Sequence, residues 1–264
     1  MIDAISASAI IRRAMKSPAC LLLSILSAAT IRAAVVDIPA LKDTTLYESQ
    51  AGALANGGGS YFFAGRTGQF SDSLRRGLIE FDIASVIPAG SIINSAQLVL
   101  NADKGGAGST VVSVHRVTRE WTEGTTIAPS GEGQGGAPVL GNDATWLHAT
   151  STSVFWNGPG AAGDFNAAAS SIQTITDINA FYTWTGLNGD VQTWVNDSNQ
   201  NHGWLLMGDE ATASSSVRFA SRNNASLGLR PVLHVDFTPV PEPSASVLAG
   251  IFVFTSLRRR TRTR

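Results

Sequence analysis

Short runs of alternating apolar and polar residues recur from Ala34 to Phe237, and they restrict the fold more than any other feature of the chain. Every second residue is apolar in Arg76–Ile83, Ser95–Asn101 and Val232–Phe237. A strand with one buried face has this period of two, and the Gly, Asn, Ser and Pro residues between the runs are typical of turns. We therefore expect an all-β domain, with further strands at Val35–Ile38, Thr44–Tyr47, Tyr61–Arg66, Val111–Val117, Gly203–Met207 and Ser216–Ala220. The core-facing residues are expected to include Ile79, Phe81, Ile83, Ala96, Leu98, Leu100, Leu233, Val235 and Phe237.

One stretch has a helical period instead. Leu187, Val191, Trp194 and Val195 are spaced to form a single stripe along a helix, and Asn188 or Asp190 is suited to cap its start. About ten strands, one short helix and no βαβ alternation favour a jelly-roll β-sandwich. The helix is expected to plug one end of the sandwich.

The N-terminal residues 1–33 have the pattern of a signal peptide. Met15-Lys16-Ser17 is a short basic region, and the apolar run Ala19–Ala29 follows it. Met15 is the expected true start, the alternative being a genuine extended basic region. Cys20, the single cysteine, lies in this segment. The mature domain is therefore expected to have no disulfide and to depend on its own core.

Removing both ends changes the charge of the chain. The net charge of the whole sequence is -1, from 19 Lys and Arg against 20 Asp and Glu. Between Ala34 and Val240 there remain 10 basic and 18 acidic residues, so the mature domain carries about -8 by this count. An acidic surface repels phosphate backbones, which argues against nucleic acid as a partner. It is compatible with neutral glycans, or with acidic glycans bridged by calcium.

Residues 239–264 form a three-part tail. Pro239 begins a linker, Pro241-Glu242-Pro243 is a rigid polar motif, and the uncharged run to Leu257 is followed by Arg258, Arg259 and Arg260. As a helix the apolar run would reach about 20 Å, less than a hydrocarbon core of about 30 Å. The proline break and the arginines nevertheless favour a transmembrane or sorting helix over a core helix.

This tail resembles the PEP-CTERM sorting signal of Gram-negative bacteria. The motif Pro241-Glu242-Pro243, the apolar run and the arginine cluster match that signal in order. The resemblance implies recognition by an exosortase, cleavage near the motif, and delivery to the cell surface, the outer envelope or the extracellular matrix.

Nine short stretches of residues 34–238 together match a known domain pattern. They are Asp43–Leu46, Arg76–Asp82, Ile87–Gly90, Ser95–Leu98, Val117–Gly124, Ala144–Trp146, Asp190–Trp194, Asn201–Leu206 and Arg230–Leu233. In these stretches the chain resembles the DNRLRE-type domain of secreted bacterial and archaeal proteins. The resemblance implies a β-jelly-roll related to carbohydrate-binding modules, some of which bind acidic polysaccharides such as alginate. The loop Gly124–Asp143 is longer and richer in Gly than the family pattern, which leaves the ligand open if that loop borders the site.

Three tryptophans are the candidate carbohydrate-binding residues. Sugar C–H faces stack on aromatic rings, and Trp156 is expected to be exposed because Asn157-Gly158-Pro159-Gly160 follows it. Trp146 and Trp121 are intermediate candidates. For each, a place in the core is the alternative.

Catalytic and metal patterns are weak. Glu120 and Glu123 flank Trp121, and glycosidases use two carboxylates, but acidic residues are common in turns. The four histidines are scattered and are expected to be structural. Calcium is possible because exported β-sandwiches use it, but no EF-hand spacing is present. The loop residues Asp164, Asp209 and Glu210 could contribute oxygens.

We expect an exported, non-catalytic surface or matrix module that binds extracellular polysaccharide. The first alternative is a structural surface or biofilm protein with no specific ligand. The second is a polysaccharide-degrading enzyme. An exposed aromatic strip in a groove would favour binding, and a cleft with two facing carboxylates and a shifted pKa would favour catalysis.

Overall fold

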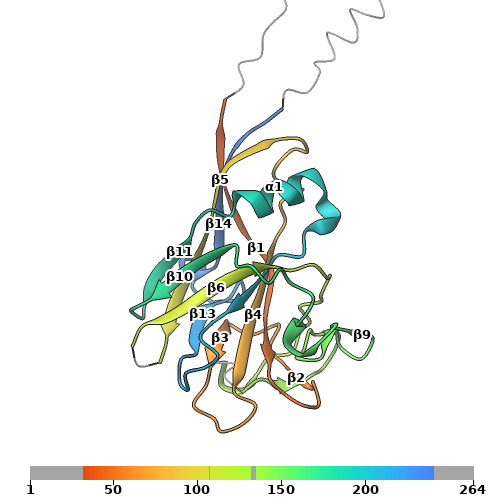
Figure 1. The fold of residues 1–264 in the computed structure, drawn as a ribbon, viewed down its shortest axis with the longest axis vertical. Coiled ribbons are helices and arrows are strands. Elements are labelled where there is room, and N and C mark those ends of the chain that lie inside the picture. Colours follow the sequence, from red (N-terminus) through yellow and green to blue (C-terminus); the bar gives the residue numbers. More distant parts are fainter. Residues whose placement is uncertain (1–31, 107, 132–134, 241–264) are drawn as a thin grey trace, which may run out of the picture. The chain divides into compact units, whose positions relative to one another are not determined.

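The computed structural model describes residues 32–106, 108–131 and 135–240, and this part of the chain is all-β (Figure 1). The strands are β1 (Ala34–Tyr47), β2 (Leu54–Ala55), β3 (Tyr61–Arg66), β4 (Leu74–Phe81), β5 (Ile92–Lys104), β6 (Thr110–Arg116), β7 (Ala137–Pro138), β8 (His148–Thr150), β9 (Val154–Phe155), β10 (Ser171–Ile175), β11 (Ala180–Trp184), β12 (Trp204–Met207), β13 (Val217–Ala220) and β14 (Val232–Thr238). The helix is α1 (Asn188–Asn196), and the 3₁₀-helices are η1 (Pro129–Gly131), η2 (Pro159–Ala161), η3 (Ser198–Gln200) and η4 (Leu227–Leu229).

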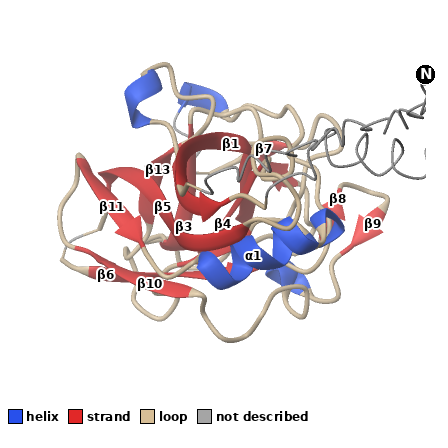
Figure 2. Cartoon of the chain, turned by 90° about the horizontal axis from the view of Figure 1, so that it is seen from above, coloured by secondary structure: helices blue, strands red, loops and turns tan. Residues whose placement is uncertain are grey.

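Six antiparallel strands form a closed barrel, which Figure 2 views from its end. The hydrogen-bonded order is β1-β14-β5-β13-β3-β4, and a second pairing of β1, with β4, closes the ring. The strands β12, β6 and β10 continue the sheet beyond β4, and β11 pairs with β5. Closure leaves these six strands without an open edge between them.

Two strands turn corners and so belong to both sides of the ring. The residues from Ala34 to Pro39 pair with β14, whereas those from Ala40 to Tyr47 pair with β4 after a register shift. On β3, Tyr61–Ala64 pair with β13, and Gly65 and Arg66 pair with β4. Gly65 has φ +111°, a conformation that L side chains rarely adopt. Such irregularities bend a strand, so its two halves can pair with different neighbouring strands.

The main core is shared by the barrel, the added strands and α1, and it confirms the predicted period of two. All nine residues predicted to face the core are at most 5% exposed, and they belong to one cluster with Trp184, Trp194 and Trp204. The predicted strand from Tyr61 to Arg66 matches β3. The stretches around Val35 and Tyr47 are one strand, β1, rather than two. The strands β10 and β11 were not predicted.

A second core covers the outer face of β4. Leu46, Leu78 and Leu205 pack there against residues of the long segment between β6 and β10. Because that segment shields the face, both faces of β4 are buried, and Glu80 is only 8% exposed. The alternation of β4 suggested that its outward face meets solvent. That face is instead covered by the second core.

The predicted helix is confirmed as α1. Leu187, Val191, Trp194 and Val195 are buried in the main core, and Gln192 binds the backbone of Ser91 and Ile93 beside the start of β5. The predicted side-chain cap is wrong. Leu187 is at the N-cap position and no side chain caps the helix. Asp190 instead accepts a hydrogen bond from the Trp204 indole at 2.7 Å.

Residues 1–31 and 241–264 lie outside the described residues. The expected signal peptide, the start at Met15, the motif Pro241-Glu242-Pro243 and the stop at Arg258, Arg259 and Arg260 all fall there, so they stay predictions. Within the part of the chain that the structure describes, no helix is long and apolar enough to cross a membrane.

A buried carboxylate sits in the barrel wall where β1 pairs with β4. Asp43 is 1% exposed, and its Oδ2 accepts a hydrogen bond from the backbone N–H of Arg222 at 2.6 Å. Its backbone N–H donates to Glu123 Oε1 at 2.9 Å, and the Arg222 guanidinium pairs with the same Glu123 carboxylate. Burial raises the pKa of Asp43 to about 8, although the Arg222 hydrogen bond acts in the opposite direction.

The free energy of unfolding should therefore fall as the pH rises from about 4 to about 8. Folded Asp43 holds its proton more tightly than unfolded Asp43, so its stabilising contribution is fully present below the ordinary pKa of 3.8 and is lost as the pH passes about 8. Asp43→Asn keeps an acceptor for Arg222 and should flatten this slope. Urea unfolding across a pH series measures it, with exposed Asp177→Asn as control. An unchanged slope in the Asp43 variant would assign the pH dependence to another group.

Candidate functional site

The three tryptophans proposed as sugar platforms are buried. Trp121 is 1% exposed, Trp146 8% and Trp156 5%, so the expected exposure of Trp156 is wrong. All three pack in the second core. The indole N–H groups of Trp121 and Trp156 donate to the carbonyls of His202 and Thr145, each at 2.9 Å. Rings fixed in this way cannot stack on a sugar, although Trp146 reaches the wall of a surface groove.

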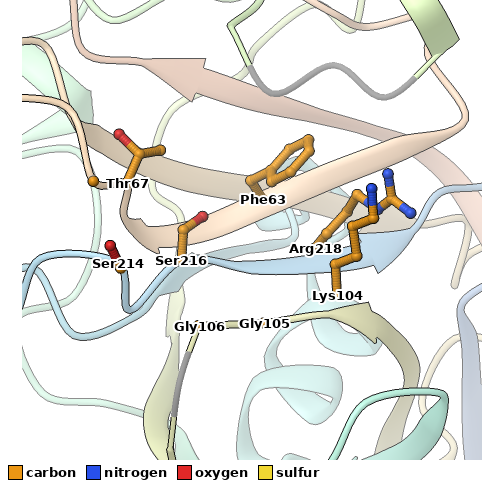
Figure 3. A pocket seen from close by; sticks show the side chains of 9 residues that line it. Phe63, Thr67, Lys104, Gly105, Gly106, Ser214, Ser216 and Arg218 are labelled. Carbon is orange, nitrogen blue, oxygen red and sulfur yellow. The ribbon is translucent and has the colours of Figure 1, made fainter.

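A basic pocket of about 220 Å³ lies where β3, β13 and the end of β5 meet (Figure 3). Two cations, three hydroxyl side chains, one aromatic ring and three glycines make up its wall. These residues are Phe63, Thr67, Gly68, Lys104, Gly105, Gly106, Ser214, Ser216 and Arg218. We call this cavity the basic pocket.

Strand pairing places the two cations of the basic pocket beside one another. Arg218 is opposite both Lys104 and Phe63 in the strand register. The Arg218 guanidinium is 6% exposed, makes two hydrogen bonds to Asp103 at 2.7 and 2.6 Å, and lies 3.9 Å from the centre of the Tyr61 ring. These contacts hold Arg218 in one position, whereas Lys104 is exposed at the rim.

The basic pocket also has hydroxyl groups that suit a polar ligand. The Ser216 hydroxyl is buried and has no hydrogen-bond partner among the described residues, and Ser214 and Thr67 line the same wall. Carboxylate or sulfate oxygens prefer charged donors such as guanidinium and ammonium, and hydroxyls can donate or accept. The pocket is therefore chemically suited to an anionic sugar.

A larger groove of about 460 Å³ lies on the other side of the loop between β3 and β4. Its wall combines aromatic and apolar side chains with polar ones. These residues are Glu48, Ser49, Gln50, Arg66, Phe70, Ser71, Asp72, Ser73, Trp146, Leu147 and Pro159. Phe70 is fully exposed, at 103%. We call this cavity the aromatic groove.

A third cavity of about 200 Å³ holds two carboxylates, and we call it the carboxylate cleft. Its residues are Lys42, Glu80, Glu120, Ser198, Asn199, Asn201 and His202. Burial raises the pKa of Glu80, although the Lys42 ammonium, 3.0 Å from its carboxylate, acts in the opposite direction. Burial lowers the pKa of His202. Glu123, the sequence partner of Glu120, lies elsewhere and pairs with Arg222.

The remaining polar candidates have structural partners. His115 contacts Ser113 Oγ and the Asn166 carbonyl, both at 2.9 Å. His148 contacts the Thr145 hydroxyl at 3.1 Å. The fourth histidine, His234, pairs with Asp37 at the surface.

The oxygens suggested for calcium are engaged separately. Asp164 binds Arg119, Glu210 binds Arg76, and Asp209 accepts backbone N–H groups from Ala211 and Thr212. Within the described ranges, no group of three or more His, Cys, Asp or Glu residues is arranged to hold a metal ion. No described residue of the loop Gly124–Asp143 (124–131 and 135–143) lines any of these three cavities.

Sequence reasoning missed Lys104, Arg218 and Phe70. The two cations come together only through the pairing of β5 with β13. Phe70 did leave a signal, because it is a lone large apolar residue in the polar stretch from Thr67 to Ser73.

Comparison with known proteins gives no assignment. No family model matches the chain, and no curated protein matches it either. The resemblances to the DNRLRE-type domain and to the PEP-CTERM signal therefore stay predictions, and the three cavities are the basis for a functional proposal.

Arg76 on β4 holds the aromatic side of the domain together. Its guanidinium makes two hydrogen bonds to Glu210, at 2.7 and 2.9 Å, and a third to the Gly160 carbonyl at 2.7 Å. It also lies 5.3 Å from the centre of the Trp146 ring. The side chains of Arg76 and Glu210 are 13% and 22% exposed, so the pair is largely shielded from water.

Arg76→Ala should lower the free energy of unfolding by about 3 kcal/mol, because it leaves the Glu210 carboxylate and the Gly160 carbonyl without their donor. Chemical denaturation measures the loss. His234→Ala breaks the exposed pair with Asp37 and should cost less than about 1 kcal/mol. Equal losses in the two variants would contradict the role given to Arg76.

Proposed function

We propose that the protein is a non-catalytic module that binds polysaccharide, with the basic pocket as its main site. The proposal rests on one observation. In the strand register Lys104 of β5 lies opposite Arg218 of β13, and the unpartnered Ser216 hydroxyl lines the same pocket. A fixed guanidinium, an ammonium at the rim and several hydroxyls suit the carboxylate and hydroxyl groups of an acidic sugar.

The proposal includes the finer architecture and the route of the protein. We propose that the closed barrel with its added strands is a jelly-roll and that α1 is its plug helix. Residues 1–33 would direct export. Residues 239–264 would act as an exosortase-recognised tail that transiently anchors the protein in the membrane. The destination would be the cell surface, the outer envelope or the extracellular matrix of a Gram-negative bacterium.

The charge of the domain supports a local rather than a general attraction for anions. The domain as a whole is acidic, so nucleic acid is not a proposed partner. An acidic polysaccharide would be repelled by most of the surface and attracted at the basic pocket. Binding of an acidic polysaccharide would therefore be confined to one part of the domain surface, the basic pocket. A structural surface protein without a specific ligand remains the alternative.

Lys104→Ala should weaken binding to polygalacturonate about tenfold, the equivalent of about 1.4 kcal/mol, because one charge-assisted contact is lost. Lys104→Arg keeps the charge and should restore most of the affinity. Isothermal titration calorimetry measures both variants, with neutral dextran as the control ligand and with calcium and then chelator present. No binding of any polysaccharide by folded protein would favour the structural alternative.

The enzymatic alternative would act at the carboxylate cleft, where Glu80 and Glu120 lie with a raised pKa at Glu80. We expect no shortened chains after prolonged incubation with polysaccharide, because the Lys42 ammonium lies 3.0 Å from the Glu80 carboxylate and occupies it as an ion-pair partner, so Glu80 is not free to act as a proton donor to a leaving group. Reducing-end assays and size separation measure this outcome. Products that disappear in both Glu80→Gln and Glu120→Gln would replace the non-catalytic proposal with a hydrolase.

A further inference from the structure

The loop Thr67–Ser73 between β3 and β4 separates the basic pocket from the aromatic groove. Thr67 and Gly68 line the pocket, whereas Phe70 and Asp72 line the groove. Gly68 and Phe70 are two positions apart, so their Cα atoms are at most about 7 Å from each other. The two cavities therefore border the same short loop, which we call the ridge.

The ridge is held in place by a buried arginine. Arg75 is 2% exposed, and its guanidinium donates to the Asp72 carbonyl at 2.9 Å and to Gln69 Oε1 at 3.2 Å. The ends of the loop are joined by a hydrogen bond from Thr67 N–H to the Ser73 carbonyl at 2.8 Å. These contacts fix the loop on both sides of Phe70, so less backbone entropy would be lost when a ligand binds there.

Phe70 has no apolar contact that explains its presence. It is fully exposed, and an exposed phenyl ring forgoes the favourable burial of a large apolar area. It stands on the wall of a groove that also contains the edge of Trp146 and the side chain of Pro159. A sugar ring can stack its C–H face on such a ring while its hydroxyls remain hydrogen-bonded.

The two sides of the ridge differ in charge. The basic pocket has the exposed Lys104 and an Arg218 whose charge is paired with Asp103, whereas the groove has the carboxylates of Glu48 and Asp72 together with Arg66. A second acidic sugar in the groove would meet those carboxylates and be repelled. A neutral sugar would offer them hydroxyl donors instead.

We infer that the aromatic groove is a second subsite for the same ligand. A neutral sugar ring of that ligand stacks on Phe70 in the groove while an acidic sugar occupies the basic pocket. This inference rests on the proposed function. It defines the ligand as a polysaccharide that contains both acidic and neutral residues and is long enough to cross the ridge. Phe70 is then a specificity-determining residue, and affinity depends on chain length.

The test uses hyaluronan oligosaccharides, in which an acidic sugar alternates with a neutral one. Calorimetry with a disaccharide and an octasaccharide should show about tenfold tighter binding of the octasaccharide. Phe70→Ala should abolish this gain without changing disaccharide affinity, and Phe70→Tyr should keep it. Leu140→Ala, which removes another exposed apolar side chain (79% exposed), is the control and should behave like the parent protein. A galacturonan octasaccharide, which is acidic throughout, should lack the gain.

The outcomes separate this inference from the proposed function. An octasaccharide gain that survives in Phe70→Ala overturns the second subsite while leaving the basic pocket in place. An equal, Phe70-dependent gain with galacturonan overturns the preference for a neutral sugar. Absence of binding by every ligand overturns the proposed function, and this inference with it.

Discussion

The structure depends on the double pairing of β1. One half of this strand pairs with β14 and the other half with β4, so the barrel closes through a single strand with a register shift between Ala40 and Lys42. Without that corner β14 and β4 would each have an open edge. Closure also fixes β3, which pairs with β13 and then with β4. The ridge between the basic pocket and the aromatic groove begins where β3 ends.

The strands and the helix were predictable because their signals are local. Alternation in the stretches that became β4, β5 and β14, and the helical stripe from Leu187 to Val195, depend only on neighbouring residues. The second core was not predictable in this way. Trp156 lies next to a Gly- and Pro-rich turn, which locally indicates a surface loop, but the segment folds back over β4 and buries the ring. The same packing buries Glu80, whose alternation pointed to solvent.

The site was less predictable than the fold because it is made by strands far apart in the chain. Asp103 and Arg218 are 115 positions apart and meet only through the pairing of β5 with β13. Neither residue belongs to a motif, and a register between distant strands has no local signature. Phe70 was different, since a large apolar residue in a polar loop is visible in the sequence. The sequence does not show, however, that Arg75 binds the Asp72 carbonyl and the Gln69 side chain and so holds the loop that carries Phe70.

The strand β5 has the chain termini of the described domain at one end and the basic pocket at the other. At one end of the strand Ile92 pairs with Thr238, and Ala34 lies opposite Phe237, so the described chain enters and leaves there. At the other end Lys104 lies opposite Arg218 in the strand register, in the basic pocket. Twelve residues of strand separate these ends by about 40 Å. Under the proposed function, a domain anchored through either flanking segment would therefore present its basic pocket away from the attachment.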